Sequence, residues 1–131
     1  MDKTSHVMDL QLLDFDCSED AEGVVCWDAL AQPAARHTHA LLQEVSQVLA
    51  WAHGLGRPGP GPLEDGADWD FDVQVRLLGP GSTAAHAHWD PAQRVLQISP
   101  QPGADQSLVL SLSLSGTPGF AHAFRAHWNA P

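Results

Sequence analysis

Two histidines separated by one residue are the most chemically suggestive pair in the chain. His86 and His88 lie in a predicted β-strand, so both imidazoles would project from the same face, as two metal ligands in a sheet must. If the apolar faces of adjacent strands are aligned, Asp72 lies opposite His88 and Asp70 lies opposite Asp90. This cluster suits Zn²⁺ or another divalent metal. Cross-strand His–Asp pairs are also ordinary stabilisers of an exposed sheet face, worth about 0.2–1 kcal/mol each. We favour the second interpretation and predict no metal site.

An acidic segment near the N-terminus has oxygen-bearing side chains at alternate positions, like the start of a calcium-binding EF-hand loop: Asp14, Asp16, Ser18, Asp20 and Glu22. The loop requires glycine at its sixth position and glutamate at its twelfth, and these positions hold Glu19 and Val25. The flanking residues favour strands and not helices. We therefore interpret the segment as an acidic hairpin loop.

The sequence contains no strong motif for catalysis or cofactor binding. Neither serine nor cysteine lies in a recognisable nucleophile motif. The glycines around Gly56 alternate with prolines and lack the Lys and Ser or Thr of a phosphate-binding loop. Cys17 and Cys26 flank a predicted turn, a spacing that would permit a disulfide across a hairpin, but we expect two reduced, half-buried thiols. We predict no catalytic residue and no cofactor.

Four segments with a period of two are predicted to form the sheet that carries the histidines. Apolar and polar side chains alternate over residues 69–77, 84–90, 95–99 and 107–115, which is typical of half-buried strands. Short turns connect them, so we predict a four-stranded antiparallel meander over residues 68–115. Earlier in the chain, residues 8–17 are predicted to form a strand with a β-bulge near Leu12, because the apolar parity changes there. Residues 24–30 are predicted to form a further strand.

Two amphipathic segments are predicted to be helices. One begins near Pro33 and ends at Gly54, with an apolar stripe at three- and four-residue spacing. The other follows Thr117, which is expected to be its N-cap. The fold class is therefore α+β, with about six antiparallel strands in the order β-β-α-β-β-β-β-α, both helices on one face, and a single domain over residues 1–131. The predicted core is Leu41, Val45, Val48, Phe71, Val73, Val75, Leu110, Leu112 and Phe124.

The charge balance narrows the classes of partner. Lys and Arg total 6 and Asp and Glu total 16, for a net charge of −10, which opposes binding to nucleic acid or to an anionic membrane. The chain has no apolar run of about 18 residues and no signal-like start, so we expect a cytoplasmic protein. We expect a small non-enzymatic domain that binds another protein through its acidic sheet face or its first hairpin.

Three further hypotheses remain open from the sequence. One is a divalent-metal-binding protein or metal-dependent enzyme centred on His86, His88, Asp72 and Asp90. Another is a nucleic-acid mimic, whose carboxylates would occupy a basic groove. The sheet edges also suggest a homodimer, because pairing with a second copy would protect one of them.

Overall fold

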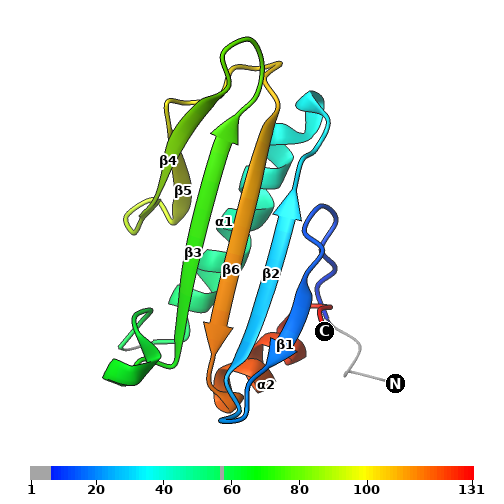
Figure 1. The fold of residues 1–131 in the computed structure, drawn as a ribbon. Coiled ribbons are helices and arrows are strands. Elements are labelled where there is room, and N and C mark those ends of the chain that lie inside the picture. Colours follow the sequence, from blue (N-terminus) through cyan, green and yellow to red (C-terminus); the bar gives the residue numbers. More distant parts are fainter. Residues whose placement is uncertain (1–6, 57) are drawn as a thin grey trace.

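The computed structural model describes residues 7–56 and 58–131 and contains one antiparallel sheet with two α-helices on one side (Figure 1). The predicted α+β fold and element order are confirmed. The strands and helices are β1 (Asp16–Glu19), β2 (Val25–Ala31), α1 (Thr38–His53), β3 (Trp69–Leu77), β4 (Thr83–Asp90), β5 (Val95–Ser99), β6 (Leu108–Gly116) and α2 (Pro118–His127). Short 3₁₀ turns span Ala35–His37 and Leu63–Asp65. Among the described residues, no helix is long and apolar enough to cross a membrane.

The predicted meander is wrong in one respect, which is the position of the last strand. The sheet order is β1-β2-β6-β3-β4-β5, so β6 lies between β2 and β3 and does not pair with β5. Its helix-facing leucines, from Leu108 to Leu114, are at most 1% exposed, while serines occupy most of its other face. A strand whose apolar face is buried along its whole length is most stable in the centre of a sheet, where both edges are paired.

The core lies between the sheet and the helices. Most of the predicted core is buried, namely Leu41, Val45, Val48, Val75, Leu110, Leu112 and Phe124. Phe71 and Val73 face the helices as predicted but are only half-buried. The reason is that β4 pairs with β3 only from Val75 to Leu77 and leaves the rest of β3 without a neighbour on that side.

The β4–β5 hairpin leaves β3 because it packs against α1. The Ser46 hydroxyl accepts the backbone N–H of Leu96 at 2.9 Å, and the Arg94 guanidinium donates to the carbonyl of Ala50 at 2.8 Å. The His53 imidazole lies between the separated strands, stacked on Trp89 at 4.7 Å and edge-on to Phe71 at 5.7 Å. The two strands are therefore held apart by a side chain of α1.

On its other side, α1 holds the N-terminal segment through Glu44. The Glu44 carboxylate accepts the backbone N–H groups of Gln11, Leu12 and Leu13 at 2.7–2.9 Å. This bend changes the parity of the buried side chains and takes the place of the predicted β-bulge. The strand that follows is short, beginning only at Asp16.

The helix starts differ in how well the sequence predicts them. Thr117 is the N-cap of α2, and its hydroxyl accepts the N–H of Phe120, as predicted. The long helix α1 begins at Thr38, after a 3₁₀ turn, and not near Pro33. Thr38 is fully buried and donates to the carbonyl of Gln106 at 2.9 Å, so a tertiary contact places the start of α1.

Candidate functional site

The face of the sheet that points away from both helices is the strongest candidate for a functional surface (Figure 1). The strand registers align its side chains in rows across β1, β2, β6 and β3. One row holds Asp16, Asp28, Ser113 and Asp72, and the next holds Ser18, Cys26, Ser115 and Asp70. Aspartates thus flank a central column of serines on this open face, which we call the open sheet face.

Only some of the carboxylates on this face are bound to other side chains. The Ser113 hydroxyl donates to Asp28 at 2.6 Å, and the Gln74 amide donates to Asp72 at 3.1 Å. Beside them, Leu30 on β2 is 75% exposed, and it lines a shallow depression of about 580 Å³ together with Val109 and Ala84 among others. A second depression, of about 290 Å³, lies over the aspartate rows. The face therefore combines negative charge with one prominent apolar side chain.

The two cysteines lie on opposite faces of the sheet and are not linked. Cys17 is paired with Trp27 and faces the helices, whereas Cys26 is paired with Ser18 and faces outward. Burial, reinforced by the nearby charge of Asp28, raises the pKa of the Cys26 thiol. A thiol with a raised pKa stays protonated at neutral pH and is a poor nucleophile. The expectation of two free thiols is confirmed.

The histidine pair occupies the predicted face of β4, but the structure does not pair it with the aspartates of β3. The predicted register is present where the strands meet, with Val75 opposite Ala85. Beyond that point β4 pairs with β5, which places His86 opposite Ser99 and His88 opposite Gln97. The predicted pairing of Asp72 with His88 is therefore absent from the ladder.

Asp90 has its carboxylate engaged in the turn that follows β4. It accepts the N–H groups of Ala92 and Gln93 at 3.0–3.1 Å and the side-chain amide of Gln97 at 3.0 Å. Within residues 7–56 and 58–131, no three His, Cys, Asp or Glu side chains form a group that could hold a metal ion.

The acidic hairpin loop is confirmed as a hairpin turn. Asp20 organises it, because its Oδ1 accepts the N–H groups of Glu22 and Val24. Gly23 has a φ of 88°, which glycine adopts without strain. The Asp20 carboxylate therefore stabilises the turn through its backbone hydrogen bonds.

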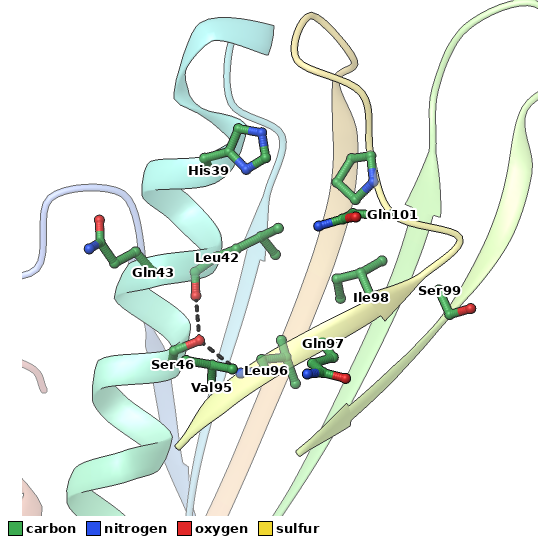
Figure 2. Close-up of a pocket in the computed structure, with 11 residues that line it drawn as sticks. His39, Leu42, Gln43, Ser46, Val95, Leu96, Gln97, Ile98, Ser99 and Gln101 are labelled. Carbon is green, nitrogen blue, oxygen red and sulfur yellow. Dashed lines mark hydrogen bonds between the residues drawn. The ribbon is translucent and has the colours of Figure 1, made fainter. Parts of the chain in front are cut away.

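A groove of about 620 Å³ separates the first half of α1 from β5 (Figure 2). Ser46 closes its narrow end, where the hydroxyl bonds both the carbonyl of Leu42 and the N–H of Leu96. The groove widens toward His39 and Gln101. Its described lining contains no acidic residue, lysine or arginine, and His39 is the titratable side chain among its lining residues.

Sequence patterns gave no sign of the aromatic cluster around His53. Its ring contacts Trp69, Phe71 and Trp89 at centroid distances of 4.7–5.7 Å, and its Nδ1 lies 2.7 Å from the Leu49 carbonyl oxygen. Position 53 lies near the end of the predicted first helix, and helical periodicity alone does not place its ring among aromatic side chains of the sheet. The only available signal was its position one turn after Leu49, at the end of the apolar stripe.

Comparison with known proteins does not identify a family for this chain. No protein-family model, no curated protein and no solved structure matches the chain.

Proposed function

We propose that this chain is a non-enzymatic domain that binds another protein through the open sheet face. The observation that carries the proposal is Leu30, which is 75% exposed in a sheet face that neither helix covers. Leu30 lines one depression together with Val109 and Ala84, and a contiguous apolar patch bordered by polar residues, unlike a single exposed leucine, marks a protein-binding surface. The aspartates beside Leu30 add a preference for a positively charged partner.

The chemistry of the face supports binding over catalysis. The pKa of Cys26 is raised, and the Ser113 hydroxyl donates a hydrogen bond to Asp28 in a row that contains no histidine. A carboxylate that accepts a serine hydroxyl orients that side chain but is a weak base for its activation. The same groups suit recognition, because Asp28 and Asp72 present acceptors to Lys or Arg side chains.

The proposal is tested by site-specific photo-cross-linking followed by affinity measurement. A benzophenone amino acid replaces Leu30 in native cells, and a control chain carries it at the exposed Ala40 on α1. A cross-linked protein that forms only from position 30 is identified, purified and titrated against the chain by calorimetry. We expect the Asp28→Asn, Asp72→Asn double variant to bind this protein about tenfold more weakly, the loss of about 1.4 kcal/mol.

The matched control removes two carboxylates elsewhere, with Glu64→Gln and Asp65→Asn in the exposed 3₁₀ turn. This variant should bind within about twofold of the wild type, because exposed charges outside an interface contribute little to the binding free energy. Equal losses of affinity for the two double variants would show a general charge effect and would refute the role of the open sheet face. Identical cross-links from positions 30 and 40 would refute it as well.

A further inference from the structure

Among the residues that the structure describes, no strand lies beside the outer edge of β1, which is a row of backbone groups. β1 is the first strand in the sheet order and pairs only with β2. The N–H of Asp20 donates to the carbonyl of Val24 at 2.9 Å, so these two residues form a hydrogen-bonded pair next to the β1–β2 ladder. Because bonded and non-bonded pairs alternate along antiparallel strands, the N–H and C=O groups of Cys17 and Glu19 point away from β2. In the described part of the chain, no backbone hydrogen bond outside the strand pairing reaches them.

The side chains along this edge are strongly acidic. Asp14, Asp16, Glu19, Asp20 and Glu22 all lie on or beside β1, and each of them is exposed. Charged side chains keep an open edge from pairing with a similar strand. Two β1 strands side by side would bring Asp16 and Glu19 of both copies together, so the edge disfavours a second copy and favours a basic strand.

A cavity lies next to the same edge, at the end of β1. It measures about 520 Å³ and is lined by Glu19, Val25, Pro118 and Ala121 among others. Glu19 and Val25 are opposite each other on the helix side of the sheet, so a strand added to β1 would direct its helix-side residue toward this cavity. The cationic residue on the far wall, Arg125, already donates to the carbonyl of Pro131.

We propose that β1 binds an extended basic segment of the partner protein, which joins the sheet as a seventh strand. Cys17 and Glu19 supply the backbone donors and acceptors. Asp16 pairs with a Lys or Arg on the open side, and the cavity beside Glu19 receives an apolar side chain on the helix side, next to Val25 and Pro118. Backbone bonds supply the affinity and alternate side chains supply the specificity, as in other strand additions. This inference rests on the proposed function and names the partner segment.

The test uses a synthetic peptide of alternating Lys and Val, seven residues long, with capped ends. Its binding to the isotope-labelled chain is followed by NMR. We expect the amide signals of Cys17 and Glu19 to shift and their hydrogen exchange to slow. A peptide of the same sequence with alternate amides N-methylated keeps the charge but loses the hydrogen bonds on one edge, and should bind at least about tenfold more weakly.

Two variants separate charge from backbone pairing. Asp16→Asn should weaken binding several-fold, about as expected for the loss of one exposed charge pair. Glu19→Pro removes an N–H that points away from β2, a position where an edge strand tolerates proline, and it should abolish binding. If Glu19→Pro fails to fold, the N-methylated peptide still tests the backbone contribution.

The outcomes distinguish this inference from the proposed function. Equal binding of the two peptides would overturn strand addition. Shifts confined to Asp28, Asp72 and their neighbours would overturn it too, while leaving the open sheet face as a binding surface. Absence of binding by the Lys–Val peptide overturns the β1 proposal alone, because the cross-linking experiment at Leu30 tests the face independently.

Discussion

The two edges of the sheet are protected from association in different ways. At β5, the outward N–H of Leu96 donates to Ser46, and Arg94 ties the adjoining turn to the end of α1. Pro100 and Pro102 follow the strand and have no N–H to offer. At β1, no helix residue accepts a backbone N–H of the strand in the described part of the chain, and protection comes from carboxylates.

The difference shows that one edge is closed by tertiary hydrogen bonds and the other only by charge. At β5 the Leu96 N–H is already bonded to Ser46, so this donor is unavailable to a further strand of either charge. Charge excludes strands of the same sign and attracts those of the opposite sign. The edge with electrostatic protection is therefore the one available for a selective partner.

Both edges depend on the central strand β6, so a substitution that disrupts β6 should have the largest effect on stability. Leu112 is 0% exposed, and we expect Leu112→Ala to reduce the free energy of unfolding by about 2–5 kcal/mol, because the cavity collapses only partly. Urea denaturation measures the change. A loss below about 1 kcal/mol would contradict the assignment of this sheet face to the core.

Removal of the hydroxyl that closes β5 should have the next largest effect. Ser46→Ala leaves the buried N–H of Leu96 without its acceptor, which should cost about 1–3 kcal/mol and speed hydrogen exchange at Leu96. Ser18→Ala on β1 is the matched control and should change stability by less than about 0.5 kcal/mol. Similar costs for the two serine variants would remove the distinction between the edges.

The homodimer expected from the sheet edges stays a prediction, and β1 is the edge where a second copy would pair. Like charges oppose this pairing, so Asp16→Asn with Glu19→Gln should favour the dimer, as should about 1 M salt, which screens beyond about 3 Å. Light scattering at about 100 μM, well above a dissociation constant of about 1 μM, measures the mass. A mass of 14.1 kDa for both proteins in low and high salt would rule out this dimer.

The reactivity of Cys26 tests the electrostatics of the open sheet face near β1. Since burial and then the charge of Asp28 raise the pKa of Cys26, Asp28→Asn should lower this pKa and increase the thiolate fraction at pH 7. Alkylation by iodoacetamide, measured by mass spectrometry in a Cys17→Ser background, should accelerate by up to about tenfold, the effect of one pKa unit. An unchanged rate would show that Asp28 does not act on the thiol.

The smallest expected effect concerns metal binding at the other end of the sheet. We expect no stoichiometric Zn²⁺ in the chain purified without chelator, and no change in melting temperature on addition of about 10 μM metal, because a ligand far below its dissociation constant stabilises negligibly. One bound equivalent that disappears in the His86→Ala, His88→Ala double variant would instead support the metal-binding hypothesis and contradict the proposed function.

The sequence by itself determined most of the elements and the face on which their side chains lie. A period of two assigns Val75 and Leu112 to the core and Asp72 to the open face, because strand geometry alternates side chains without reference to the rest of the molecule. The N-cap at Thr117 was predictable for the same reason, since a cap bonds the backbone only three residues away.

Only the tertiary structure decided which strands are neighbours and where a ladder ends. The position of β6 beside β2 and β3 depends on contacts between distant parts of the chain, and no local pattern encodes them. The separation of His88 from Asp72 has the same origin, since His53 of α1 lies between Trp89 and Phe71. Alternation predicts the face of a residue, whereas packing of the helix against the sheet determines what lies opposite it.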